Sequence, residues 1–422
     1  MAMFEFGRDL RKLFGEARDS DDLGWLELIG ADLLAVEAKA LTTDGGRVSC
    51  KTPSRTWTRA SALWREHARR TGDRTSLDKA LATAADALKA APHAEDQARA
   101  GLAVALAWLT AFDLYGDRTA LDEATHAARE TQPKRLATLA LSAAVHARIR
   151  TRQARLSGLT ADRLDAAALM DAALHALIKH NPAEADDLRL DGAALALEAG
   201  ILERDARLLD QAGRDLQALV SASNPDTRPL TRARALALCG AGLSALAAMA
   251  GDAEATATGH ALFDAAADQF FPDHSPMDWA AVQVARAVDP DTPVEALMQA
   301  EALTGGHGTV LGALALDLLI QREIALAATN GDVMALTRIE TRVRRRLAER
   351  VGAPGAIDWA ADQIAMARLM IARAELMGTN PDQAAFVLSE AAEAATDHGV
   401  PVLADRARGL MLGLGLDVRQ RS

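Results

Sequence analysis

Four arginines are the side chains whose type and placement come nearest to a binding chemistry. They fall within predicted helices, at Arg65, Arg69, Arg148 and Arg152. A guanidinium group binds a carboxylate through paired hydrogen bonds, so some of these arginines could hold acidic side chains of a client. The alternative is a solvated helix face whose arginines pair with neighbours such as Glu66. We take the four as candidate partner-binding residues, with a protein or peptide as the expected client.

Patterns typical of catalysis or metal binding are weak by comparison. Asp273, His274 and Asp278 lie close together in a proline-containing link. Because a metal site needs correctly placed and well-supported ligands, these side chains are interpreted as helix caps and water-binding groups. Residues 305–309 form a Gly-Gly-His-Gly-Thr run, but it follows a helix and lacks the lysine of a phosphate-binding loop. The sequence therefore predicts no catalytic residue, no metal, no cofactor and no enzymatic activity.

Charge and composition exclude several classes of partner. The chain has 422 residues and a formal net charge of −11, whereas a nucleic-acid-binding domain normally carries a basic stripe. The densest basic run, residues 342–346, has Glu340 and Glu349 beside it and is interpreted as a salt-bridged surface. No long uninterrupted apolar run is present, which predicts no membrane span. Cys50 and Cys239 are interpreted as ordinary thiols. We expect a cytoplasmic protein, with the Ala-, Arg- and Asp-rich usage of bacteria.

The elements that would position these residues are predicted to be helices throughout. Half of the residues are hydrophobic, yet only 4% are aromatic, and much of the apolar content is alanine. Alanine has the highest helix propensity and lets helices approach closely. Runs that alternate like strands are not convincing. The fold class is therefore expected to be all-α.

Internal repeats indicate how the helices are organised. Residues 72–80 (GDRTSLDKA) recur as residues 116–124 (GDRTALDEA), 44 positions later. Near the other end, residues 278–285 recur as residues 358–365, offset by 80. Self-similarity at a period of about 20–50 residues is typical of stacked repeat arrays.

Polar turns recur roughly every 40 to 47 residues and divide the chain into about eight helical pairs. The first helices are expected at residues 58–71, 96–115, 136–155, 184–203, 231–250, 278–288, 310–330 and 358–377. The second helices are expected at residues 76–91, 120–131, 161–179, 206–221, 253–270, 292–304, 333–351 and 382–397. At the turns, glycine would end one helix in the left-handed conformation. Thr75 with Asp78, and Thr119 with Asp122, resemble capping boxes for the next helix.

Both ends of an array need caps that cover an otherwise exposed core face. We expect N-terminal capping helices and a loop in residues 1–56, including a helix at residues 22–41. The repeat array would span residues 57–398, and a C-terminal capping helix and tail residues 399–422, with the helix at residues 401–416.

The first residues contain a short amphipathic pattern. Phe6, Leu10, Leu13 and Phe14 fall at helical spacing beside basic residues. Such a segment either docks on the first helical pair as part of the cap or contacts a membrane surface. Docking is favoured, because one short segment binds lipid weakly.

Tryptophans occupy repeated positions. Trp64 and Trp108 are 44 residues apart, and Trp279 and Trp359 are 80 apart. Equivalent positions in successive repeats usually serve packing between helices, so Trp108 in particular is expected to be buried. Stacking on a ligand is the alternative.

The first two units resemble a known family, the tetratricopeptide repeats. The residues at the family's spacing are Trp64, Ala68, Ala80, Ala87 and Pro92, followed in the next unit by Trp108, Tyr115 and Ala124. The match covers residues 58–133 and is looser beyond, the units are longer than usual, and Thr71 and Phe112 replace expected residues. The resemblance implies a right-handed superhelix whose first helices line a concave groove that binds peptides or proteins.

The expected fold is thus an all-α, right-handed superhelical array of about eight tetratricopeptide-like hairpins with capping helices. The expected function is a non-enzymatic scaffold, adaptor or client-binding chaperone that uses the groove. Two alternatives stay open: a regulatory or client-delivery subunit of a separate enzyme, and a small-molecule- or metal-dependent enzyme.

Overall fold

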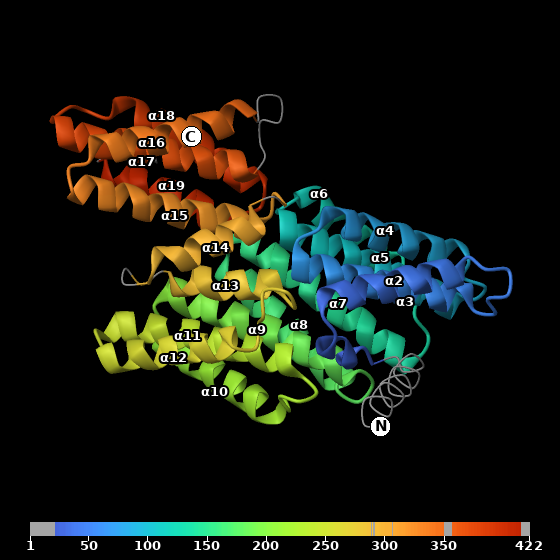
Figure 1. The fold of residues 1–422 in the computed structure, drawn as a ribbon. Coiled ribbons are helices and arrows are strands. Elements are labelled where there is room, and N and C mark those ends of the chain that lie inside the picture. Colours follow the sequence, from blue (N-terminus) through green and yellow to red (C-terminus); the bar gives the residue numbers. More distant parts are fainter. Residues whose placement is uncertain (1–21, 288, 290–291, 306, 350–356, 415–422) are drawn as a thin grey trace, which may run out of the picture. The chain divides into compact units, whose positions relative to one another are not determined.

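The computed structural model describes residues 22–287, 289, 292–305, 307–349 and 357–414, and within them every regular element is a helix (Figure 1). The all-α class is therefore confirmed for this part of the chain. The amphipathic pattern at residues 6–14 lies outside the described residues. The elements are a 3-10 helix, η1 (Gly24–Leu28), and the α-helices α2 (Ala31–Gly45), α3 (Pro53–Thr71), α4 (Arg74–Lys89), α5 (Ala94–Tyr115), α6 (Arg118–Arg129), α7 (Leu136–Ser157), α8 (Thr160–Leu177), α9 (Pro182–Glu203), α10 (Ala206–Ala222), α11 (Pro229–Ala250), α12 (Ala253–Ala267), α13 (Pro276–Arg286), α14 (Val294–Thr304), α15 (Val310–Thr329), α16 (Val333–Glu349), α17 (Ile357–Met377), α18 (Asp382–Asp397) and α19 (Pro401–Gly413).

A glycine followed by an aspartate joins helices at several turns. Gly72 has a φ of 72°, in the left-handed region that glycine adopts without steric cost. The carboxylate of the next residue, Asp73, accepts hydrogen bonds from the backbone N–H groups of Thr75 (3.1 Å) and Ser76 (3.0 Å). The arrangement recurs at residues 116–117, 251–252 and 331–332. One dipeptide thus ends a helix and begins the next.

The prediction that Thr75 and Thr119 cap helices α4 and α6 is wrong. Helices α4 and α6 begin at Arg74 and Arg118, before the threonines that were expected to cap them. The caps are Asp73 and Asp117, whose carboxylates face the free N–H groups of the first turn and also complement the helix dipole.

The N-terminal helix expected at residues 22–41 is also wrong, because it is two elements. The 3-10 helix η1 ends before Ile29, and α2 begins at Ala31. Gly30 between them has extended backbone angles, φ −68° and ψ 163°. Glycine is costly inside a helix, so a break at this residue costs little.

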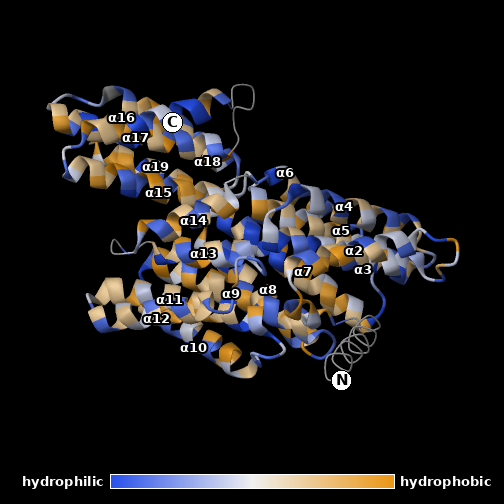
Figure 2. Cartoon of the chain, in the orientation of Figure 1, coloured by the Kyte–Doolittle hydropathy of each residue, from blue (hydrophilic) through white to orange (hydrophobic). Residues whose placement is uncertain are grey.

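Two compact units make up the described chain, each with its own cores. The first unit comprises residues 22–67, 78–107 and 124–275, and the second comprises residues 68–77, 108–123 and the described residues from Pro276 onward. Helices that follow one another in sequence pack together, as α7 does on α8 and α17 on α18. In Figure 2 apolar and polar residues alternate along the helices, which is typical of helices with one buried and one solvated side.

Alanine lets helices of the first unit approach closely. Ala144 and Ala147 on α7 and Ala166 on α8 are fully buried in one apolar cluster with Leu188 of α9. Gly200 of α9 leaves so little room that a Cβ there would lie 2.8 Å from the side chain of Leu209 on α10.

The second unit contains buried ion pairs between helices. Asp317 of α15 has no exposed surface, and its carboxylate lies 3.5 Å from Nε of Arg368 on α17 and 2.5 Å from Nη1 of Arg406 on α19. From the predicted basic run, Arg346 reaches Asp362 of α17 at 3.1 Å and Glu301 of α14 at 3.3 Å.

The other arginines of that run also form ion pairs. Arg344 pairs with Glu340 at 2.7 Å, and Arg345 with Glu349 at 3.8 Å. Both pairs are four residues apart on α16, so the predicted salt-bridged surface is confirmed for Arg344 and Arg345, whereas Arg346 pairs with a buried carboxylate.

Among the helices that the structure describes, two could cross a membrane by length and composition alone, α5 and α11. In α5, 67% of the apolar window is buried inside the protein, as in the core helix of a globular fold. In α11 the buried share is 28%. The absence of a membrane span therefore stays a prediction.

Trp64 is buried in the apolar cluster of the N-terminal region. Its side chain is 5% exposed and packs with Leu34 and Leu63. Its indole N–H donates to Oγ1 of Thr42 at 3.0 Å. Trp108 is only half-buried, so the prediction that it is buried is wrong.

Replacing Trp64 by alanine should lower the free energy of unfolding by about 3–5 kcal/mol, because a large buried ring is lost and a cavity is left. Trp108→Ala should cost clearly less, since that ring is already partly solvated. Urea denaturation followed by circular dichroism measures both. Equal losses would contradict the difference in burial.

Candidate functional site

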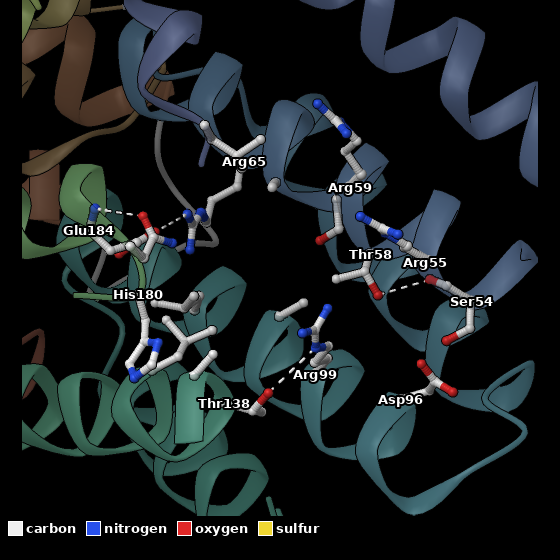
Figure 3. A pocket seen from close by; sticks show the side chains of 18 residues that line it. Ser54, Arg55, Thr58, Arg59, Arg65, Asp96, Arg99, Thr138, His180 and Glu184 are labelled. Carbon is white, nitrogen blue, oxygen red and sulfur yellow. Dashed lines mark hydrogen bonds and ion pairs between the residues drawn. The ribbon is translucent and has the colours of Figure 1, made fainter. Parts of the chain in front are cut away.

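A pocket of about 200 Å³ lies within the first compact unit, between α3, α5, α7 and the start of α9 (Figure 3). These are four of the helices that were expected to come first in their pairs. Its α3 side carries Arg55, Thr58, Arg59, Ala62 and Arg65. Their spacing of three and four residues places them on one face of the helix.

Apolar and charged groups share the lining. Helices α3, α5 and α7 contribute small and apolar side chains, at Ala62, Ala103, Leu106, Ala137 and Leu141. Four guanidinium groups line the pocket together with two carboxylates, those of Asp96 and Glu184. In Figure 3, Arg55 and Arg99 lie on one side of the pocket centre and Arg65, His180 and Glu184 on the other, whereas the guanidinium group of Arg59 points away from Arg99. The lining thus has four positive and two negative side chains, and Glu95 next to it lies 3.8 Å from Nε of Arg99.

Glu95 fixes the distance between α5 and α7 at one end of the pocket. Its carboxylate accepts hydrogen bonds from the backbone N–H groups of Lys134 (3.1 Å) and Arg135 (3.2 Å), and from the hydroxyl of Thr138. Burial by itself would raise the pKa of Glu95, but these hydrogen bonds and the charge of Arg99 outweigh it and lower the pKa. The ionised carboxylate therefore caps the beginning of α7 and keeps Thr138 and Arg99 in the pocket wall.

Glu184 connects three of the pocket helices. It lies in the first turn of α9, where the side chain of Asn181 caps its backbone N–H at 3.2 Å. Its carboxylate is 2.8 Å from Nη1 of Arg148 on α7 and 3.5 Å from Nη2 of Arg65 on α3. Burial would raise the pKa of Glu184, but Arg148 and then Arg65 outweigh it and lower the pKa.

The same ion-pair network continues between α7 and α9. Asp191 lies 3.1 Å from Nε of Arg148 and 3.0 Å from Nη2 of Arg152, and each arginine is 7% exposed. Burial would raise the pKa of Asp191, whereas Arg152 and Arg148 lower it below its usual value. For Arg148, burial would lower the pKa, and the charges of Glu184 and Asp191 raise it. We call Arg65, Arg148, Arg152, Glu184 and Asp191 the α7–α9 network.

The four predicted binding arginines thus have different surroundings. Arg65 lines the pocket. Arg148 and Arg152 are buried in the α7–α9 network, where carboxylates of α9 pair with them. Arg69 belongs to the second compact unit, not to the pocket. Their contact with a client stays a prediction.

Three arginines of the pocket were not among the predicted residues: Arg55, Arg59 and Arg99. A signal for the first two was present in the sequence. Arg55 and Arg59 are four residues apart, which is helical spacing, but we placed the start of the expected helix at residue 58, five residues too late, and so left Arg55 outside it. No comparable pattern marks Arg99.

The other residues considered in the sequence, His274, the 305–309 run and Cys239, lie outside the pocket lining. Nε2 of His274 lies 3.0 Å from the backbone oxygen of Glu27. In the 305–309 run, of which residue 306 is not described, the hydroxyl of Thr309 caps α15 through the N–H of Gly312 at 3.1 Å. Within the described ranges, no three His, Cys, Asp or Glu side chains are grouped so that they could hold a metal ion. Burial raises the pKa of the Cys239 thiol to about 11.

Comparisons with known proteins assign no family to the chain. No protein-family model matches the chain, and no curated protein is significantly similar to it.

Replacing Arg148 by methionine should destabilise the protein by about 3–5 kcal/mol, because Glu184 and Asp191 would lose a buried partner. The matched control is Arg214→Met, which removes an arginine whose pair with Asp210 is 59% and 60% exposed. That control should cost less than about 1 kcal/mol. Urea denaturation at neutral pH compares the two, and similar losses would show that the network adds no stability.

The α7–α9 network should also make the fold sensitive to acid. Because the pKa values of Glu184 and Asp191 are lowered on folding, their ionised forms stabilise the fold above their ordinary values of 4.5 and 3.8. That stability is lost as the pH falls through the lowered values. Unfolding free energies measured from about pH 7 to pH 3 should therefore fall less steeply below about pH 4.5 in Glu184→Gln/Asp191→Asn than in the parent. Parallel curves would contradict the lowered values.

Proposed function

We propose that this chain is a non-enzymatic recognition protein whose pocket between α3, α5, α7 and α9 binds an acidic segment of a partner protein. It would act as a scaffold, adaptor or client-binding chaperone in a cytoplasm. The observation that carries the proposal is the pocket itself, in which four guanidinium groups and only two carboxylates surround small and apolar side chains.

The chemistry of the lining favours a segment with both acidic and apolar residues. Guanidinium groups bind carboxylates through charge-assisted hydrogen bonds, which are about twice as strong as neutral ones. Ala62, Ala103 and Leu141 offer apolar surface to a side chain between such carboxylates. A negatively charged protein repels an acidic partner at long range, but this field is screened beyond about 8–10 Å in physiological salt. The arginines would act within that distance.

The order of helices supports a tetratricopeptide-like array as the framework. Long helices with small side chains alternate with second helices across glycine–aspartate turns. In the proposed array α3 to α18 form eight hairpins of a right-handed superhelix, with α2 and α19 as caps. The first helices α3, α5, α7 and α9 would then share the concave side, in agreement with their common pocket.

The test is the binding of a fluorescein-labelled synthetic peptide of Asp, Glu and Leu residues, measured by fluorescence anisotropy. Arg59→Ala/Arg99→Ala should weaken binding at least about tenfold, because a hydrogen bond to a charged group contributes about 1.5–3 kcal/mol. The matched control is Arg207→Ala/Arg214→Ala, which removes the same charge from exposed positions on α10.

Added salt should weaken peptide binding to the parent more than to the pocket variant. Equal affinities for the pocket and control variants would place binding elsewhere, and no binding by the parent would overturn the proposed function.

A further inference from the structure

One stretch of the chain joins a leucine of the pocket lining to a buried carboxylate that is bound outside the pocket. Residues 22–27 read Asp-Leu-Gly-Trp-Leu-Glu and include most of η1. Leu23 lines the pocket and also packs on the apolar cluster that contains Leu26 and Trp64. The side chain of Asp22 accepts a hydrogen bond from the N–H of Gly24 at 2.9 Å, which holds the turn just after Leu23.

The other end of this stretch is held by a carboxylate receptor at the start of α11. Glu27 is only 6% exposed. Its carboxylate lies 2.7 Å from Nε of Arg228, and it accepts hydrogen bonds from the backbone N–H (2.9 Å) and the hydroxyl (2.5 Å) of Thr231. A charged donor, a hydroxyl and a helix N-terminal N–H thus surround one carboxylate.

The backbone between these two ends lies close to the receptor. A Cβ on Gly24 would lie 3.3 Å from Nη1 and 3.4 Å from Cδ of Arg228, so a larger residue here would push this arginine aside by a few tenths of an ångström. The backbone oxygen of Glu27 is 3.0 Å from Nε2 of His274. Arg228 is further bound by Asp186 of α9 at 3.3 Å, which keeps its guanidinium group in place.

We infer that residues 22–27 are an internal competitor, which occupies the pocket with Leu23 and the α11 receptor with Glu27 until an acidic and apolar segment of a partner displaces them. The inference rests on the proposed function, because it concerns the same pocket. The match is chemical: the stretch has leucines between two carboxylates, Leu23 lies in the pocket, and an arginine outside the lining, Arg228, binds the carboxylate of Glu27.

Displacement need not unfold the N-terminal core. Leu26 and Ile29 are buried with Leu34, Leu63 and Trp64 and would anchor the stretch in place. Leu23 is only partly buried, and the bonds of Glu27 can be exchanged for those of an equivalent carboxylate. A partner would therefore replace the contacts of two side chains, Leu23 and Glu27, and the intramolecular copy would set the affinity that the partner must exceed.

The test uses a fluorescein-labelled peptide with the sequence of residues 22–29, added to the full chain and followed by anisotropy. In Leu23→Ala/Glu27→Gln the internal copy is weakened, and the peptide should bind at least about tenfold more tightly than to the parent. The control is Leu28→Ala/Asp32→Asn, which changes exposed residues of the same region and should leave binding at the parent's level. Circular dichroism and the thermal midpoint show whether the variants are folded.

Two further arms identify the site. Adding Arg228→Met to the weakened variant should abolish the gain, and a peptide that carries the same Leu→Ala and Glu→Gln changes should show no gain. A gain from misfolding would depend neither on Arg228 nor on these peptide residues.

The unrelated Asp/Glu/Leu peptide separates this inference from the proposed function. If that peptide binds the parent at the pocket but neither peptide binds the weakened variant more tightly, residues 22–27 only stabilise the fold. The inference is then overturned, whereas the proposed function stands. If neither peptide binds the parent or the variant, the inference and the proposed function both fail.

Discussion

The pairing of Glu184 with arginines from two other helices is the interaction on which the pocket depends. One carboxylate at the start of α9 lies 2.8 Å from Arg148 of α7 and 3.5 Å from Arg65 of α3. It therefore sets the positions of three of the four helices that surround the pocket. Arg65 is both a part of this network and a part of the lining, so its orientation depends on Glu184.

Because many of the buried side chains are small, ion pairs are needed to fix the positions of neighbouring helices. Where alanines such as Ala144 and Ala166 face each other, helices approach closely but bury few atoms per residue. Contacts between such similar faces leave the register of neighbouring helices weakly specified. Directed pairs between charged groups select one register, and their removal leaves a buried charge unpaired. The second unit uses Asp317 in the same way, with arginines from α17 and α19.

The sequence predicts the helical framework well because its turns are encoded locally. Gly72 and Gly251 supply left-handed residues between helices, and both positions were recognised as breaks. The capping residue was misassigned because Asp73 and Thr75 are both good caps, and only the backbone geometry selects between them. A pair such as Arg148 with Glu184 is 36 residues apart, and nothing local marks the arginine as buried.

Prediction of the candidate site was therefore partial. Arg65 could be placed by the expectation that first helices line a groove, whereas Arg99 needed the positions of α5 and α7 in space. Trp108 illustrates the opposite error, because an equal place in the repeat does not ensure equal burial. Trp64 is covered by α2 of the N-terminal region, a neighbour that the repeat pattern does not describe.

The contact between Glu27 and α11 also bears on the order of events during synthesis. Thr231 follows Glu27 by 204 residues, so the receptor does not exist when η1 leaves the ribosome. At elongation rates of about 5–20 residues per second, roughly 10–40 s pass before α11 is made. During that interval helices α3 to α9 can pair with their neighbours through local contacts, whereas the carboxylate of Glu27 remains hydrated. Glu27 is thus synthesised well before the helix that it finally contacts.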